Sequence, residues 1–237
     1  MTTVSTPKLE PEPMRDPDDD HLLTPENCAI ALIDYQEGQY ATVGSASSDE
    51  IDLGVVTLAQ LARAYEIPTV LTTVAVGMGV HNGTVDAITR ELPGTAEIDR
   101  TGVNSWEDAD FRLAIEATGR RKIVMAGLWT EVCLTLPALD MLRQGYEIYP
   151  VIDAVGGVSP VSHQTAIERM TQAGAQPITA LAFGCELMRN WARLDADRYR
   201  AVINDYFRRK RNTGQASGDL FANDPPTTVN ATDRTGT

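Results

Sequence analysis

The sequence predicts an α/β protein, a three-layer sandwich in which a mostly parallel central sheet is covered by helices on both faces. Short apolar runs rich in β-branched residues alternate with longer segments whose apolar residues recur at helical spacing, which is typical of βαβ units. The strand-like runs are apolar almost throughout, as parallel strands are when both faces of a sheet are buried. With 237 residues, of which 43% are hydrophobic, the chain is long enough for one well-buried domain.

The first half of the predicted domain contains three strands and two helices. Residues 28–34 form an apolar run and residues 68–76 are rich in β-branched side chains, so both are predicted strands. Residues 51–66 carry apolar side chains at helical spacing, and residues 107–119 form an amphipathic helix that ends at a glycine. A short strand is expected between these helices, at 96–98.

The second half repeats this alternation. Apolar runs at 122–128 and 146–154 are predicted strands, and QPIT at 176–179 is a short final one. Residues 130–145 and 162–174 are predicted helices, each closed by a glycine. In such a sheet the crossovers are right-handed and ligands bind outside the carboxyl ends of the strands. Residues that directly follow the strands are therefore the first candidates for a functional site.

Residues 22–211 are expected to form this single domain, between flexible tails at 1–21 and 212–237. Both tails are rich in polar residues and bury too little apolar surface to offset the entropy of ordering. The first tail lacks the apolar core of a secretion signal, and no run of about 18 apolar residues exists that could span a membrane. No membrane partner is expected.

The charge and the cysteines narrow the function classes further. A formal net charge of -13 argues against nucleic acid as a partner, because the only basic cluster, Arg208–Arg211, follows a predicted helix. Cys28, Cys133 and Cys185 fit neither a disulfide framework nor a zinc-finger pattern. A reducing, cytoplasmic location is therefore expected.

Cys133 is the first candidate for chemistry. It lies in the first turn of the predicted helix 130–145, where free backbone N–H groups and the helix dipole favour a thiolate. The same N–H groups could form an oxyanion hole. The alternative is a small buried apolar residue, which is the commonest role of a free cysteine. Pro137 lies inside the same predicted helix, so a kink is expected there.

Asp34 and Arg100 are two further candidates, each with a simpler structural alternative. Asp34 ends an apolar strand, where its carboxylate could act as a general base toward a thiol, or merely cap a helix or a loop. Arg100 precedes the helix at 107–119, and its cation could lower the pKa of both Cys133 and Asp34. A solvated loop arginine is the alternative for Arg100.

The strings ALIDYQEG, RTGVNSWED, VMAGLWTEVCLTLPALDMLRQGYEIYPVIDAVGG and ERMTQAGA resemble the isochorismatase-like hydrolase family, and most closely its YcaC-like branch. The similarity spans about residues 22–210, and GLWTEVC is its most specific part. The resemblance implies an isochorismatase-like, Rossmann-like fold, which agrees with the pattern of predicted elements. It also implies that Asp34, Arg100 and Cys133 are the catalytic residues.

Two further expectations follow from the resemblance. It implies a cis peptide between Leu128 and Trp129, and an oxyanion hole formed by the backbone N–H groups of Trp129 and Cys133. Most active members of the family have a lysine where this chain has Arg100. Arginine keeps the positive charge but cannot give up its proton, and YcaC-like members resemble this chain in having it.

Neither a metal nor a cofactor is expected. Nicotinamidases of the family bind a metal through an aspartate and closely spaced histidines after the second strand, whereas this region here contains only His81. His21 and His163 lie elsewhere in the chain, and scattered ligands do not make a metal site. The glycines of VGMGV do not match the dinucleotide-binding pattern.

These observations lead to one main hypothesis and one alternative. The main one is a cysteine hydrolase that cleaves an amide or related bond of a small molecule through a covalent intermediate; the alternative is an inactive relative that binds a ligand or serves as an assembly subunit. Trp106 and Trp129 are expected to form aromatic walls, which favours a compact planar or apolar substrate. The apolar residues of the segment 181–207 predict a homo-oligomer.

The three thiols are expected to differ in reactivity. The helix N-terminus and Arg100 favour the thiolate of Cys133 and Asp34 opposes it, which predicts a pKa below the free-thiol value of about 8.5. If Asp34 and Cys133 couple strongly, the two groups share one proton instead. Cys28 and Cys185 are expected to be desolvated, neutral and slow to react.

Overall fold

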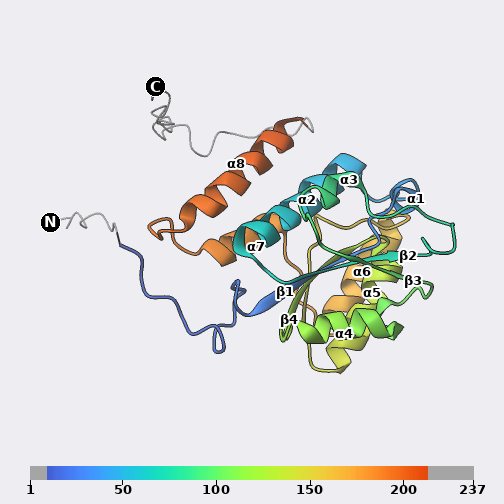
Figure 1. Ribbon diagram of the computed structural model, residues 1–237, viewed down its shortest axis with the longest axis horizontal. Helices are drawn as coiled ribbons and strands as arrows, with labels where there is room; N and C mark the ends of the chain where they lie inside the picture. Colours follow the sequence, from blue (N-terminus) through green and yellow to red (C-terminus); the bar gives the residue numbers. More distant parts are fainter. Residues whose placement is uncertain (1–9, 213–237) are drawn as a thin grey trace, which may run out of the picture.

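The computed structural model describes residues 10–212, and its centre is a sheet with helices on either side (Figure 1). Within these residues the sheet has five parallel strands in the order β3-β2-β1-β4-β5. The strands are β1 (Cys28–Ile33), β2 (Thr69–Val74), β3 (Glu97–Arg100), β4 (Lys122–Gly127) and β5 (Glu147–Pro150). The prediction of a three-layer α/β sandwich is confirmed.

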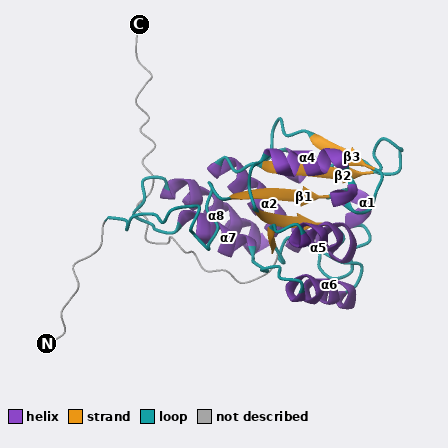
Figure 2. Ribbon diagram, turned by 90° about the horizontal axis from the view of Figure 1, so that it is seen from below, coloured by secondary structure: helices purple, strands orange, loops and turns teal. Residues whose placement is uncertain are grey.

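The helices cover the two faces of the sheet, as the views in Figures 1 and 2 show. The longer ones are α2 (Ser48–Tyr65), α4 (Ala109–Ala117), α5 (Thr135–Arg143), α6 (Pro160–Gln172), α7 (Ala180–Met188) and α8 (Ala196–Asn212). Helices α7 and α8 pack against α2, whereas α5 packs against α6 on the other side. Short helical turns complete the chain: α1 (Glu37–Tyr40), α3 (Asp86–Thr89), η1 (Ser105–Glu107) and η2 (Thr130–Leu134).

The order of the strands creates a point where the chain changes direction across the sheet. From β1 the chain crosses through α2 to β2 on one side, whereas from β4 it crosses through α5 to β5 on the other. Neighbouring strands with opposite crossovers leave a crevice outside their carboxyl ends, where α/β proteins bind ligands. In this chain the switch point lies between β1 and β4, so the segments that follow Ile33 and Gly127 are the expected place for a ligand.

The predicted strand at 176–179 is reduced to a single bridge, between Ile178 and Val151. The segment still donates hydrogen bonds from Gln176 and Ile178 to β5, and Ile152 donates to Ile178. A continuous strand pairing would also need a hydrogen bond donated by the backbone N–H of residue 150. Pro150 has no N–H, so this bond cannot form. The same proline ends β5, which is shorter than the predicted 146–154.

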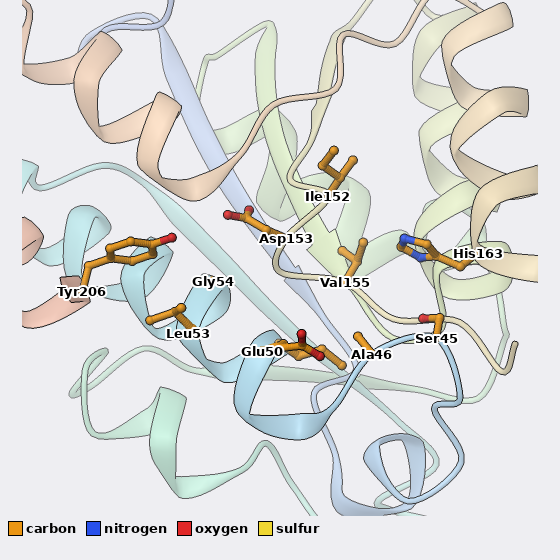
Figure 3. Close-up of a pocket in the computed structure, with 11 residues that line it drawn as sticks. Ser45, Ala46, Glu50, Leu53, Gly54, Ile152, Asp153, Val155, His163 and Tyr206 are labelled. Carbon is orange, nitrogen blue, oxygen red and sulfur yellow. The ribbon is translucent and has the colours of Figure 1, made fainter. Parts of the chain in front are cut away.

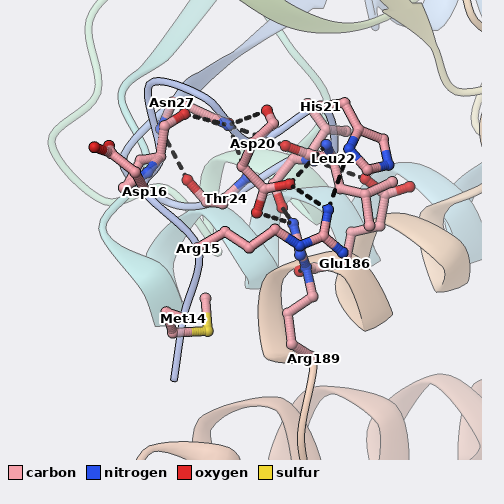
Figure 4. A network of polar contacts seen from close by, with 12 residues as sticks. Met14, Arg15, Asp16, Asp20, His21, Leu22, Thr24, Asn27, Glu186 and Arg189 are labelled. Atoms are coloured by element: carbon pink, nitrogen blue, oxygen red, sulfur yellow. Dashed lines mark hydrogen bonds and ion pairs between the residues drawn. The ribbon is translucent and has the colours of Figure 1, made fainter. Parts of the chain in front are cut away.

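The segment before β1 is anchored against the end of α7 (Figure 4). Asp20 is 1% exposed and forms an ion pair with Arg189 at 2.9 Å. Its backbone oxygen accepts a hydrogen bond from the buried Lys122 Nζ at 2.6 Å. The ordered part of the protein therefore begins before the expected boundary at residue 22.

The remaining expectations for the tails fall largely outside the description. Residues 1–9 of the expected tail 1–21 lie outside the described residues, as do residues 213–237 of the expected tail 212–237. Among the described residues, no helix combines the length and apolar character needed to cross a membrane.

The apolar side chains near the C-terminus have a different role from the one expected of them. Most of them are buried within the chain, where α8 lies on α2; these are Tyr199, Val202, Ile203 and Tyr206. Trp191 and Leu194, between α7 and α8, remain exposed. Most of the surface that led to the expectation of a homo-oligomer is therefore used inside the subunit.

The close contact between α2 and the segment after β5 generates a prediction about stability. A Cβ atom at Gly54 would overlap the carbonyl oxygen of Asp153, whereas a Cβ at Gly102 would have 3.9 Å to its nearest neighbour. Because backbone cannot move aside cheaply, we expect Gly54→Ala to lower the free energy of unfolding by about 2–3 kcal/mol. Urea denaturation measures this, with Gly102→Ala as the control that changes it by less than about 0.5 kcal/mol. Equal stability of the two variants would contradict the packing described.

Candidate active site

Asp34 is held by the backbone where β1 ends. Its N–H donates to the Thr72 carbonyl on β2 at 2.9 Å, and its own carbonyl accepts from Gln36 N–H at 2.9 Å. With φ of 59° the residue adopts the left-handed conformation, which turns the chain sharply after the strand. The buried Gln36 amide bonds both the N–H and the carbonyl of Val74, which ties this turn to the end of β2.

Arg100, the last residue of β3, pairs with Asp34 in a bidentate ion pair. Nη1 and Nη2 each lie 2.6 Å from one carboxylate oxygen, and both side chains are fully buried. Nη1 also donates to Thr72 Oγ1 at 3.1 Å and to the Thr73 carbonyl at 3.0 Å. Burial disfavours the guanidinium charge, but Asp34 outweighs burial, so the pKa of Arg100 lies above its ordinary value. This geometry excludes the alternatives of a solvated arginine and a simple loop carboxylate.

Cys133 lies in η2, a wide π-helical turn that follows β4. Leu134 N–H donates to the Trp129 carbonyl five residues earlier, and Thr130 N–H donates to the Gly156 carbonyl at 2.9 Å. The peptide bond between Leu128 and Trp129 is cis, the form that the resemblance implies. Cys133 is thus in the first helical turn after the strand, as predicted.

The kink expected at Pro137 stays a prediction. The helix geometry changes between η2 and α5, and Pro137 is the third residue of α5. Because η2 runs directly into α5, the missing N–H of Pro137 lies within one turn of this change in hydrogen bonding. The wide turn and the α-helix together cover the predicted helix 130–145.

The Cys133 thiol is 5% exposed, and the structure contradicts the prediction of a lowered pKa. Burial raises the pKa of the thiol, and the neighbouring Asp34 carboxylate raises it further. Arg100 and the backbone N–H of Trp129 act in the opposite direction but do not outweigh these effects. The reason is geometric. The charge of Arg100 is already balanced by Asp34, so the thiol lies beside an ion pair and not beside an unpaired cation.

The other two cysteines differ from one another. Cys28 is buried, its thiol contacts the Thr24 carbonyl at 3.0 Å, and burial raises its pKa to about 12. The expectation of a slow thiol therefore fits Cys28. Cys185 was expected to be desolvated too, but it is exposed on α7. Periodicity places Cys185 on a helix without showing which of its faces meets α2 and α8.

The two tryptophans expected as pocket walls have different surroundings. Trp106 is 3% exposed and packs edge-on against Phe111 and Tyr146, so it belongs to the core. Trp129 is half-buried, and its indole N–H donates to Thr42 Oγ1 at 2.9 Å. Only Trp129 therefore remains as a candidate wall at the nucleophile turn.

Sequence reasoning missed the residues that hold the site together. Thr72 and Thr73 on β2 accept hydrogen bonds from Arg100, and Gln36 ties the turn after β1 to Val74. Nothing in the local sequence marks these three residues. Another is His163, at the start of α6, whose Nδ1 lies 2.9 Å from Thr130 Oγ1. Among residues 10–212, no group of three or more His, Cys, Asp or Glu side chains is arranged to hold a metal ion.

Comparisons with known proteins identify the family of this chain. The model of the isochorismatase domain matches residues 28–181. The Escherichia coli K12 protein called "Probable hydrolase YcaC" is 35% identical over 170 residues, covering 71% of this chain and 81% of that protein. The chain belongs to the isochorismatase family of hydrolases.

Two solved structures support the same placement. The crystal structure of Escherichia coli YcaC, described as an octameric hydrolase of unknown specificity, has a TM-score of 0.76 at 33% identity, covering 82% of this chain and 95% of that one. YcaC from Pseudomonas aeruginosa, with hexane-2,5-diol and covalent acrylamide, has a TM-score of 0.74 at 34% identity, covering 82% and 98%.

A separate cavity of about 280 Å³ is shown in Figure 3. It is lined by α2 and the residues before it, by the segment after β5, and by α6 and α8. Its polar lining includes Ser45, Glu50, Asp153, His163 and Tyr206. Asp34, Arg100 and Cys133 do not line it.

The buried ion pair generates a prediction. Removing one partner leaves a buried charge without compensation, so we expect Arg100→Met to lower the free energy of unfolding by about 3–5 kcal/mol. Asp34→Asn combined with Arg100→Met should cost less than the two single changes added together, because the second change removes the stranded charge. Urea denaturation at pH 7.5 measures both, with the exposed Arg143→Met as control. Strictly additive losses would contradict the pairing.

Proposed function

We propose that this protein is a cysteine hydrolase that cleaves an amide or related bond of a small molecule through a covalent intermediate on Cys133. The observation that carries the proposal is the buried Asp34–Arg100 pair beside the buried Cys133 thiol, at the crevice where the strand order reverses. A nucleophile, a proton acceptor and a fixed cation in one crevice form a set that can perform acyl transfer.

In the proposed first half-reaction, Asp34 takes the proton from Cys133 Sγ as the sulfur attacks the substrate carbonyl. The new C–S bond converts the carbonyl oxygen into an oxyanion, which the backbone N–H groups of Trp129 and Cys133 would stabilise. When the tetrahedral intermediate collapses, the C–N bond breaks and Asp34 returns its proton to the leaving amine. This leaves an acyl group on Cys133.

In the second half-reaction, a water molecule gives a proton to Asp34 and attacks the acyl carbon. The C–S bond then breaks, the acid product leaves, and the proton on Asp34 returns to the sulfur. Because burial keeps the resting thiol protonated, the thiolate forms only as the proton moves to Asp34. Arg100 holds that carboxylate in place but cannot exchange protons itself.

Several observations support the rest of the proposal. Acrylamide is an electrophile that alkylates thiols, and the Pseudomonas aeruginosa relative is described with covalent acrylamide. The three cysteines are free, which fits a reducing, cytoplasmic location and a reduced nucleophile. The proposed steps need no metal or cofactor, and neither nucleic acid nor a membrane is proposed as a partner.

The nucleophile assignment is tested by substitution. A screen of small amides, carbamoyl compounds and isochorismate identifies a substrate, and we expect Cys133→Ala to lower kcat at least about a thousandfold, because the covalent route is lost. Cys185→Ala is the matched control and should keep full activity, as should protein dialysed against EDTA. Full turnover by Cys133→Ala would favour the alternative, an inactive fold that binds ligands or assembles; loss of activity with EDTA would contradict metal independence.

We also propose that the protein is a homo-oligomer, because its Escherichia coli relative of similar length is described as an octamer. The exposed apolar side chain of Leu194 remains available for contacts between subunits. Light scattering should therefore give a mass of at least twice the 25.8 kDa of one chain. A mass equal to one chain at micromolar concentration would contradict this.

A further inference from the structure

His163 contacts the turn that carries the proposed nucleophile, although it lies on a different helix. Its Nδ1 is 2.9 Å from Thr130 Oγ1, and Thr130 is fully buried. Thr130 follows Trp129 and begins η2, the turn that contains Cys133. The contact therefore links the first turn of α6 to the proposed oxyanion hole.

Thr130 is held at three atoms, and each bond has a different partner. Its N–H donates to the Gly156 carbonyl, its carbonyl accepts from Thr135 Oγ1 at 2.6 Å, and its hydroxyl meets His163. Of these three partners only His163 changes its hydrogen-bonding character near neutral pH. The position of Thr130 matters because the adjacent Trp129 N–H interacts with the Cys133 sulfur.

The surroundings of His163 determine how it bonds Thr130. The ring is half-buried and lines the cavity in Figure 3, through which solvent protons can reach it. Burial lowers the pKa of His163, and Glu131 on η2 opposes that shift. Around the ring, Glu50 of α2, Asp153 after β5 and Tyr206 of α8 line the same cavity.

Burial favours the neutral form of the His163 imidazole, and the Glu131 carboxylate acts in the opposite direction. A neutral imidazole with its proton on Nε2 accepts a hydrogen bond from the Thr130 hydroxyl at Nδ1, whereas the other tautomer donates from Nδ1 to the hydroxyl oxygen. When a ring of the first kind is protonated, Nδ1 becomes the donor, the bond reverses, and the buried hydroxyl hydrogen loses its acceptor. Arg169, which like His163 belongs to α6, lines a second groove together with Glu131 of η2.

We propose that His163 is a positioning residue: its neutral Nδ1 accepts a hydrogen bond from the Thr130 hydroxyl, and this bond holds the turn that begins after Trp129 and carries Cys133. This inference rests on the proposed function, because the turn matters only if Cys133 is the nucleophile. His163 acts through Thr130 and does not touch the reacting atoms.

The alkylation rate of Cys133 reports on this role without a known substrate. The full-length protein is treated with iodoacetamide, and peptide mass mapping gives separate rates for Cys133 and for the exposed Cys185, which is the internal reference. Because the thiolate is the reacting species, loosening the Trp129 N–H raises the thiol pKa and slows alkylation. We expect His163→Leu and Thr130→Val to slow Cys133 about threefold to tenfold at pH 7.5, and to leave Cys185 unchanged.

Conservative variants separate positioning from simple packing. His163→Gln supplies an amide oxygen that can accept the bond, and Thr130→Ser keeps the hydroxyl, so both should stay within about twofold of the natural protein. The double variant with His163→Leu and Thr130→Val should slow the alkylation of Cys133 no more than the single variant with the larger effect. Both changes remove the same hydrogen bond. His21→Gln, far from the site, is the control for loss of a histidine. If His163→Leu does not fold, the Cys133 alkylation rates of Thr130→Val and Thr130→Ser are compared instead, because only Thr130→Val removes the hydroxyl.

A pH series gives a second readout. The Cys133 alkylation rate of the natural protein relative to His163→Gln should be close to one at pH 7.5. It should fall at acidic pH, below the ordinary histidine pKa of about 6.5, because protonation of His163 reverses the bond and the buried Thr130 hydroxyl hydrogen loses its acceptor. A ratio that stays constant to pH 5, an unchanged rate in His163→Leu, or equal slowing by Gln and Leu would each overturn the inference. Full activity of Cys133→Ala would instead overturn the proposed function, so the two failures are distinguishable.

Discussion

Two opposite charges are buried together where β1 and β3 end, and neither could remain there without the other. Asp34 and Arg100 are 66 residues apart in the chain, and their bidentate bond joins the edge strand of the sheet to its centre. Thr72 and Thr73, on the strand between them, accept further hydrogen bonds from Nη1, whereas the buried Nε has no hydrogen-bond partner among the described residues. Because an unpaired buried charge costs several kcal/mol, the loops that follow these strands are constrained to the geometry that preserves the pair.

The same pair determines what kind of nucleophile Cys133 can be. An unpaired cation beside the sulfur would stabilise a thiolate in the resting protein, but the charge of Arg100 is balanced by the Asp34 carboxylate. In the proposed mechanism the thiol is therefore protonated at rest, and Asp34 receives its proton when a substrate arrives. Such a site keeps a reactive sulfur protected between turnovers, because the thiolate is the species that alkylating agents attack.

The nucleophile turn is supported from outside the pair by contacts with several elements. Gly156, after β5, accepts the N–H of Thr130, and His163 of α6 meets its hydroxyl. The wide turn η2 therefore lies between the sheet and α6 and is connected to both. In the proposed enzyme the switch point is the place of the chemistry, and we infer that these more distant residues align the sulfur and the backbone N–H groups.

The sequence by itself determined the strands, most helices and the three residues of the candidate site, because apolar periodicity and the ends of apolar runs are local properties. Asp34 after a buried strand and Cys133 in the first turn after another were readable in this way. Only the tertiary structure decided what surrounds them: that Asp34 neutralises Arg100, that Cys185 faces outward, and that α8 buries its apolar face on α2. The loss of a sixth strand, through the missing N–H of Pro150, also depends on which segment lies beside it. Burial and pairing are set by residues far apart in the chain, and no local pattern records which of them meet.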